Sequence, residues 1–287
     1  TDYLKDVVFD EANNCLWIAA DFTNKVNCFH LDNYRNDIYD LEPLGEESVG
    51  EALFALADTP CKLYVGTTSA VVSLDKQTLK TEVLFHQKEL FTHNYNTLLL
   101  DSKNRLWFAS DDGCVAYVID EGRFETYRIS LKKQVRSQKE LVNVIYEDRK
   151  GNIWVGTSEG VYLIDCDSKT IKAHYNLENN LARCVLKDSE DQVWVGFFGG
   201  GLGLYNPQLQ SIQLFNVLAK FPSNTINALY EDSRKRLWVA TGEGLVCFPS
   251  LTDRNYKVYQ RESGLANTHI QAISEDKAGN IWVSTNK

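Results

Sequence analysis

Adjacent carboxylates recur along the chain and are the residues best suited to acid–base chemistry. Those that recur in the same sequence context are the pairs Glu147-Asp148, Glu231-Asp232 and Glu275-Asp276. Hydrolysis of a glycosidic bond needs two carboxylates that face each other across one substrate. Here each pair stands in its own sequence repeat, so no two pairs are expected to share a substrate. The pattern therefore favours a structural role in turns over catalysis.

Other reactive constellations are missing from the sequence. The seven cysteines include no C-x-x-C pair, and neither a G-x-S-x-G motif nor a P-loop occurs. The histidines lack metal-ligand spacing; they are His30, His86, His93, His174 and His269. The sequence thus predicts no catalytic residue, no metal and no cofactor, and the chain is not expected to be an enzyme.

The elements that carry the acidic pairs belong to a repeat of 40 to 47 residues. Its most regular mark is an aromatic residue, preceded six residues earlier by an aspartate in six of the seven repeats. The seven aromatic positions are Trp17, Tyr64, Trp107, Trp154, Trp194, Trp238 and Trp282. This period is typical of propeller blades.

Each repeat alternates apolar segments with short polar or glycine-containing turns, which predicts four antiparallel strands. We therefore expect an all-β fold, a single seven-bladed β-propeller over residues 1–287. The last repeat holds only two strands before Lys287, so its blade is expected to be incomplete in this chain. The aspartate, for example Asp148, is expected to cap the turn after the first strand. Changing one such aspartate to alanine should cost about 0.5–2 kcal/mol, by analogy with helix caps.

The charge and hydropathy of the chain limit the classes of partner that it can bind. The net charge is -9 and the pI is about 5.1, so binding to nucleic acid is disfavoured. No apolar run approaches the roughly 18 residues of a membrane helix. We expect no membrane contact by this segment.

The repeat at residues 145–165, IYEDRKGNIWVGTSEGVYLID, resembles the two-component regulator propeller repeat almost word for word. Residues 273–287 fit equally well, and residues 185–206 fit with a longer glycine turn. The first two repeats diverge most, since Tyr64 replaces tryptophan and the turn at residues 10–14 is unusual.

The resemblance implies a setting and a function. Such repeats form the periplasmic sensor of hybrid two-component regulators, found mainly in gut Bacteroidetes, and bind oligosaccharides released from complex glycans. A kinase would lie outside this chain. The expected partners are an oligosaccharide, a neighbouring propeller and immunoglobulin-like domain of the same protein, and a second copy of the full sensor.

Candidate ligand-binding residues lie in the connections that vary between repeats, because binding surfaces are usually built on loops held by a regular frame. Two aromatic residues, Phe197 and Phe198, precede three glycines and could stack on a sugar or form a packed lid. Polar and aromatic residues in the connections between repeats are further candidates: His93, Asn94, Tyr95, Arg183, Asn224 and His269.

Residues 127–140 are strongly basic in an acidic protein. Lys132, Lys133 and Arg136 in this segment either keep a loop solvated or attract an anionic glycan or an acidic partner. Two other functions stay open beside the sensor: a propeller enzyme that cleaves glycans, such as a lyase or glycosidase, and a protein-interaction scaffold. The fold alone does not choose among them.

Overall fold

The computed structural model describes residues 4–20, 23–41, 53–67, 69–86, 97–110, 113–129, 142–157, 160–176, 181–206, 211–276 and 278–285. These residues are almost entirely β-strands and turns, and they fall into two compact units, Thr1–Lys139 and Glu140–Lys287. No helix among them is both long and apolar enough to cross a lipid bilayer.

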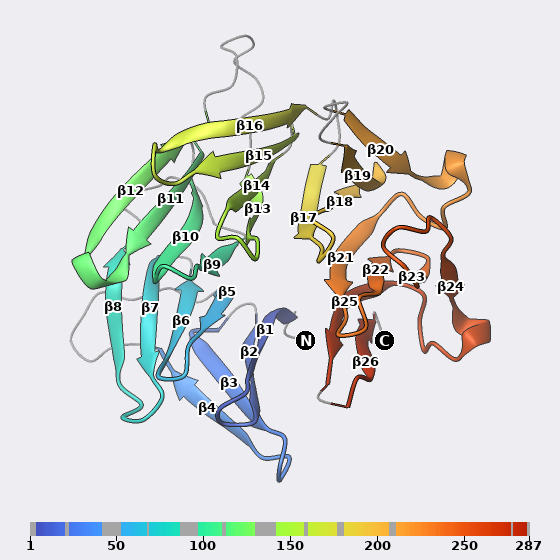
Figure 1. Ribbon diagram of the computed structural model, residues 1–287. Coiled ribbons are helices and arrows are strands. Elements are labelled where there is room, and N and C mark those ends of the chain that lie inside the picture. The colour runs from blue at the N-terminus through green and yellow to red at the C-terminus, as the bar shows by residue number, and fades with distance from the viewer. Residues whose placement is uncertain are drawn as a thin grey trace. The chain divides into compact units, whose positions relative to one another are not determined.

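The first unit contains three four-stranded antiparallel sheets (Figure 1). Consecutive strands pair in every sheet, as expected for a meander blade. The strands are β1 (Leu4–Asp10), β2 (Cys15–Ala20), β3 (Lys25–His30), β4 (Asn36–Asp40), β5 (Leu53–Asp58), β6 (Lys62–Thr67), β7 (Ala70–Asp75), β8 (Thr81–His86), β9 (Leu98–Leu100), β10 (Arg105–Ser110), β11 (Gly113–Val118) and β12 (Arg123–Arg128).

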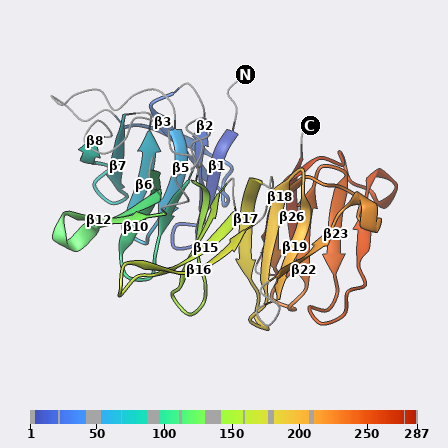
Figure 2. The ribbon, with the colours of Figure 1, turned by 90° about the horizontal axis from the view of Figure 1, so that it is seen from above.

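The second unit has three more four-stranded sheets and one two-stranded sheet. Figure 2 shows strands of this unit, among them β17, β18 and β23, from a second direction. The strands are β13 (Val142–Glu147), β14 (Ile153–Thr157), β15 (Gly160–Asp165), β16 (Thr170–Asn176), β17 (Leu181–Lys187), β18 (Val193–Phe198), β19 (Gly201–Asn206), β20 (Ser211–Phe215), β21 (Ile226–Glu231), β22 (Leu237–Thr241), β23 (Gly244–Phe248), β24 (Lys257–Tyr259), β25 (Ile270–Glu275) and β26 (Ile281–Thr285).

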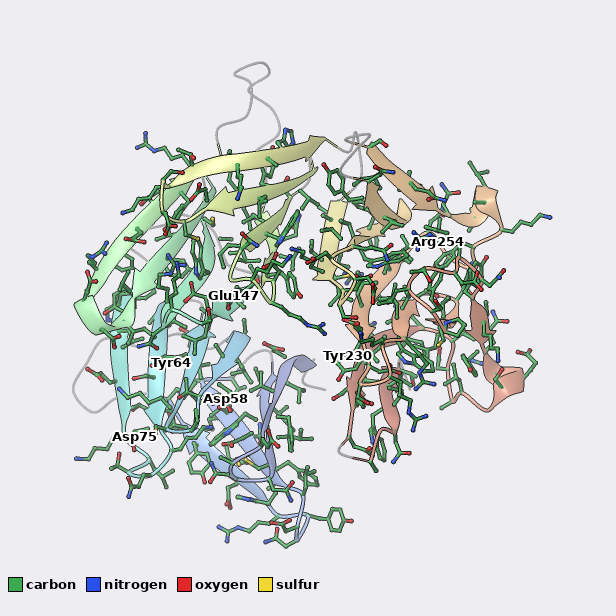
Figure 3. All side chains as sticks on the ribbon, viewed as in Figure 1. Asp58, Tyr64, Asp75, Glu147, Tyr230 and Arg254 are labelled. Atoms are coloured by element: carbon green, nitrogen blue, oxygen red, sulfur yellow. The ribbon has the colours of Figure 1, made fainter. Side chains whose placement is uncertain are left out.

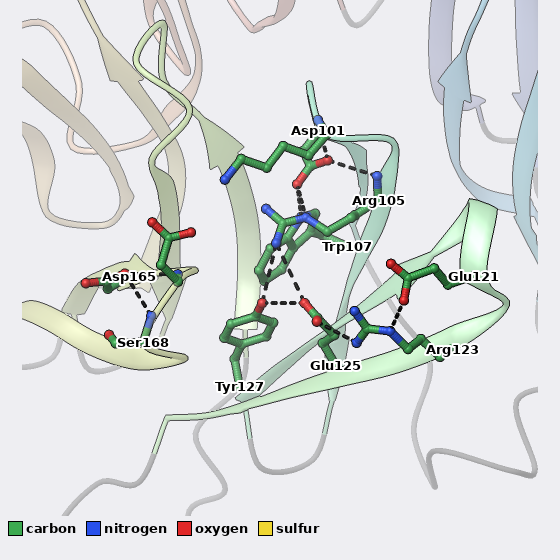
Figure 4. Close-up of polar contacts among 11 residues, drawn as sticks. Asp101, Arg105, Trp107, Glu121, Arg123, Glu125, Tyr127, Asp165 and Ser168 are labelled. Carbon is green, nitrogen blue, oxygen red and sulfur yellow. Dashed lines mark hydrogen bonds and ion pairs between the residues drawn. The ribbon is translucent and has the colours of Figure 1, made fainter.

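The turn between the first two strands is held by the repeated aspartate in every sheet with a tryptophan, as the sequence predicted, whereas Thr59 closes the β5–β6 turn. Asp148 Oδ1 accepts hydrogen bonds from the amides of Lys150 (2.8 Å) and Asn152 (3.0 Å). Its Oδ2 accepts one from Trp154 Nε1 at 3.0 Å. All six tryptophans donate in this way, and Figure 4 shows the equivalent bond from Trp107 to Asp101, at 2.7 Å. The aspartate therefore joins the turn to the tryptophan on the next strand.

The glutamates of two acidic pairs, Glu231 and Glu275, have a different role, which the sequence did not reveal. Glu275 accepts hydrogen bonds from the amide (2.7 Å) and hydroxyl (2.6 Å) of Ser233, which belongs to the preceding sheet. Glu231 likewise accepts one from the amide of Ser189 at 3.0 Å, and it pairs with Arg149 at 2.9 Å. Glu231 and Glu275 thus clamp the turns of successive sheets together, which is a structural role rather than a catalytic one.

The repeat aromatics form the interior of the four-stranded sheets. The five tryptophans there and Tyr64 are only 0–6% exposed. An aromatic residue on the fourth strand lies against the indole in several sheets, as Tyr127 does against Trp107 at a ring separation of 4.6 Å. Trp282 on β26 is 65% exposed, because among the described residues β25 and β26 pair only with each other and no third or fourth strand covers the ring.

The all-β propeller class is confirmed, but the number of blades is not. The prediction of seven blades with an incomplete last one is wrong: the described residues form six four-stranded blades. Each repeat aromatic lies on the second strand of a hairpin, and that hairpin need not belong to a four-stranded blade. The seventh aromatic, Trp282, lies in the β25–β26 hairpin, which forms a two-stranded sheet. That residues 1–287 form one propeller stays a prediction.

Candidate functional site

The turn between β18 and β19 differs from the equivalent turns of the other sheets. In three of those turns a buried threonine closes the loop: Thr67 Oγ1 donates to the carbonyl of Ala70 at 3.0 Å, Thr157 Oγ1 to that of Gly160 at 3.1 Å, and Thr241 Oγ1 to that of Gly244 at 2.7 Å. Phe197 occupies the threonine position and has no hydroxyl to donate. This loop therefore needs another way to hold its backbone.

Asn224, from the segment that leads into β21, supplies the missing support. Its carbonyl oxygen accepts hydrogen bonds from the amides of Gly199 (3.0 Å) and Gly201 (2.8 Å), and its Oδ1 accepts one from the amide of Val217 (2.9 Å). Gly201 has φ +87°, and a β-carbon there would lie 2.2 Å from the carbonyl oxygen of Phe215. Glycine is thus required at this position, and Asn224 acts first as a structural anchor.

The two aromatic residues before the glycines point in opposite directions. Phe197 is fully buried and packs in a core cluster with Trp154 and Val195. Phe198 is 56% exposed. Only Phe198 can therefore offer a ring face to a ligand, whereas Phe197, also named as a candidate ligand-binding residue, is buried, because side chains of a strand alternate between its two faces.

A β-bulge brings Arg183 beside Phe198. The register between β17 and β18 shifts between Ala182 and Cys184, which leaves Arg183 as an extra residue on β17. Its guanidinium carbon lies 5.6 Å from the centre of the Phe198 ring, within cation–π range. Its Nη1 donates to Asn227 Oδ1 at 2.7 Å. We call Arg183, Phe198, Asn224 and Asn227 the rim cluster.

His269 lies in the next connection, at Gly242. A β-carbon on Gly242 would be 3.3 Å from Ser223 Oγ and 3.7 Å from His269 Nδ1, so the two connecting segments meet there. The amide of His269 donates to Asn267 Oδ1 at 2.9 Å. The half-buried imidazole therefore lies near the segment that contains Ser223 and Asn224.

The other predicted site residues fall outside the described residues. They are His93, Asn94, Tyr95, Lys132, Lys133 and Arg136. Their proposed part in ligand binding stays a prediction.

The rim cluster has the chemistry of a binding site. It combines one exposed ring, a guanidinium and planar amides, and none of its four members is a carboxylate or nucleophile of the kind that general acid–base or covalent catalysis uses. Within the described ranges, no three histidine, cysteine, aspartate or glutamate side chains form a group that could hold a metal ion.

Asn227 is the member of the rim cluster that the sequence analysis missed. It stands one residue into its strand at a position that is polar in every repeat of the second unit: Asn143, Arg183, Asn227 and Gln271. That shared polarity within apolar strands was the available signal. The signal was overlooked because the strands were read as strictly alternating between buried and exposed residues, and a β-bulge inserts one residue that breaks this alternation.

Comparison with known proteins agrees with this architecture. Three segments, 138–159, 220–243 and 264–287, match the family model of the two component regulator propeller. Over 157 residues the chain is 24% identical to histidine kinase P4 of Formosa agariphila, a match that covers 48% of this chain and 11% of the kinase.

Solved structures extend the similarity to nearly the whole chain. The extracellular domain of a hybrid two component system from B. thetaiotaomicron is 31% identical with a TM-score of 0.68, over 99% of this chain and 44% of that one. Inactive virginiamycin B lyase from Staphylococcus aureus, solved with quinupristin, shares the fold alone, at 12% identity and a TM-score of 0.70 over 99% of this chain and 92% of the lyase. The chain spans less than half the length of the hybrid-system domain. Three segments of this chain thus match the two component regulator propeller, and nearly the whole chain is similar to the extracellular domain of a hybrid two component system.

Proposed function

We propose that this chain is the periplasmic sensor part of a hybrid two-component regulator. In this proposal it binds an oligosaccharide and signals to a kinase that lies outside the chain. The observation that carries the proposal is the 31% identity, over 99% of this chain, with the extracellular domain of a hybrid two component system. The similarity to a histidine kinase supports the same assignment.

The rim cluster is the proposed oligosaccharide site. A sugar ring presents an apolar face of C–H groups and an edge of hydroxyls, so its binding sites pair an exposed aromatic ring with hydrogen-bonding side chains. Phe198 offers the ring, and Arg183 and Asn227 lie beside it with donors and acceptors. A neighbouring propeller, an immunoglobulin-like domain and a second copy of the sensor are the proposed protein partners.

Incubation of the chain with a glycan library tests the proposal. We expect one or a few oligosaccharides to bind without turnover, and we expect Phe198→Ala to weaken that binding while the melting temperature stays unchanged, because the ring is exposed. Release of new reducing or unsaturated ends would instead identify a propeller enzyme. A library with no bound glycan would overturn the proposal.

A further inference from the structure

The bulge that exposes Arg183 recurs in every sheet of the second unit. In each case the first strand carries one extra residue, at the same place in the repeat. The register shifts lie between Val142 and Val144 on β13, Ala182 and Cys184 on β17, Ile226 and Ala228 on β21, and Ile270 and Ala272 on β25. Four equivalent bulges re-aim four equivalent side chains, and bulges of this kind are frequent beside functional sites.

The bulged residues are all polar, and they stand on neighbouring strands. β13, β17, β21 and β25 follow each other as the first strands of successive sheets (Figure 1). Arg183 Nη1 donates to Asn227 Oδ1, and Asn227 Nδ2 donates at 2.6 Å to the carbonyl of Ile270, the residue before Gln271. We call Asn143, Arg183, Asn227 and Gln271 the bulge row. Hydrogen bonds thus hold at least two of its side chains in fixed positions.

Arg183 is the charged member of the bulge row, and its charge is not neutralised within the described residues. Two other arginines of the unit are neutralised by carboxylates: Arg149 pairs with Glu231 at 2.9 Å, and Arg236 pairs with Asp232 at 2.5 Å. Arg254 (Figure 3) resembles Arg183, since it donates to Gln192 Oε1 at 3.0 Å and lies 5.6 Å from the centre of the Trp194 ring. In a chain of net charge -9, Arg183 is thus held by an amide and an aromatic ring, with no carboxylate partner among the described residues.

The geometry leaves the guanidinium ready for an anion. Phe198 covers one face of it, and Nη1 is used by Asn227, so the remaining N–H groups can form two parallel hydrogen bonds to one oxyanion. A guanidinium matches the planar fork of a carboxylate and also binds a sulfate ester strongly. We propose that the bulge row binds the acidic group of an anionic oligosaccharide, a uronate or a sulfated sugar, with Arg183 as its counter-ion. This inference rests on the proposed oligosaccharide function and specifies its ligand class.

Matched pairs of acidic and neutral probes test the inference by calorimetry on the 287-residue chain. The carboxylate arm compares oligogalacturonides with their methyl esters, and the sulfate arm compares sulfated dextran oligosaccharides with plain ones. We expect one acidic probe to bind at least about tenfold more tightly than its neutral counterpart, and Arg183→Gln to abolish that difference. Arg261→Gln removes the same charge from an exposed turn outside the row and should change the affinity by less than about twofold.

The outcomes separate this inference from the function on which it rests. Equal binding of acidic and neutral probes, or tight acidic binding that survives Arg183→Gln, overturns the bulge row as an anion site. If the glycan library yields a neutral oligosaccharide that Phe198→Ala weakens, the sensor proposal stands and the acidic ligand class falls. A circular-dichroism melt of each variant shows whether a lost affinity reflects lost folding.

Discussion

Asp148→Ala should destabilise the protein more than the loss of an ordinary turn cap. The Asp148 side chain is fully buried, and it accepts hydrogen bonds from two turn amides, from Trp154 Nε1 and, at 3.1 Å, from Lys187 Nζ. A lost cap costs about 0.5–2 kcal/mol by analogy with helix caps. The indole N–H of a tryptophan that is only 4% exposed would lose its acceptor as well, at about 1–3 kcal/mol. Because such terms are not fully additive, we expect a total loss of about 2–4 kcal/mol, measured by urea unfolding.

Asp276→Ala is the matched control for Asp148→Ala. Asp276 makes the same bonds to two turn amides and to Trp282 Nε1, at 2.9 Å. Trp282 is 65% exposed, so water can replace the lost acceptor, and the loss of stability should be clearly smaller. In a Trp154→Phe background, which has no indole N–H, Asp148→Ala should also cost less than in the wild type. Equal losses for the two aspartates, together with no coupling between Asp148 and Trp154, would refute the reasoning.

Three further predictions concern pH, the glycine loop and a buried ion pair. Burial opposes ionisation of Asp148, but hydrogen bonds from its partners outweigh burial and lower its pKa to about 2 from 3.8. Its stabilising contribution should be complete above about pH 4 and disappear as the pH falls towards 2, so the unfolding free energy of Asp148→Asn should fall less steeply over this range than that of the wild type. Gly201→Ala should lower the melting temperature more than Gly199→Ala, because a β-carbon at 201 meets the backbone and one at 199 meets open space; equal melts would contradict this. Lys76→Met should cost about 3–5 kcal/mol in urea unfolding, since it leaves the paired carboxylates of Asp10 (2.5 Å) and Asp58 (2.6 Å) without their buried cation, whereas a loss near zero would show that the pair is dispensable.

Local pattern in the sequence was enough to predict the strands and their turns. Alternating apolar residues between glycine and aspartate turns gave the antiparallel hairpins, and the position of Asp148 before its turn gave the hydrogen bonds to the turn amides. These features depend on residues only a few positions apart in the chain. They are fixed by backbone geometry and short-range hydrogen bonds, which the sequence displays directly.

Contacts between strands that are distant in sequence could not be predicted in the same way. The number of blades was overestimated because burial of Trp282 depends on third and fourth strands that β25 and β26 lack. The hydrogen bond from the Ser233 amide to Glu275 joins two sheets, and the residues next to either partner in the sequence do not predict it.

The candidate site was predicted in part. Phe198, Arg183 and Asn224 were identified from the varied connections, and the structure brings them together with Asn227. Phe197 was named as a ligand-binding candidate but is buried. The residue types near the end of a strand do not show which face of the sheet each side chain occupies. Asn227 was overlooked because a bulge shifts the side-chain alternation by one residue.

The exposed indole of Trp282 gives the chain a built-in optical reporter. The other five tryptophans are 0–6% exposed, so collisional quenchers such as iodide should reach Trp282 almost exclusively. Subtracting the emission of a Trp282→Phe variant would isolate the signal of this one side chain. Any molecule that covers the β25–β26 hairpin would then reduce the quenching constant and shift the emission to shorter wavelength, while events elsewhere in the molecule would leave both unchanged.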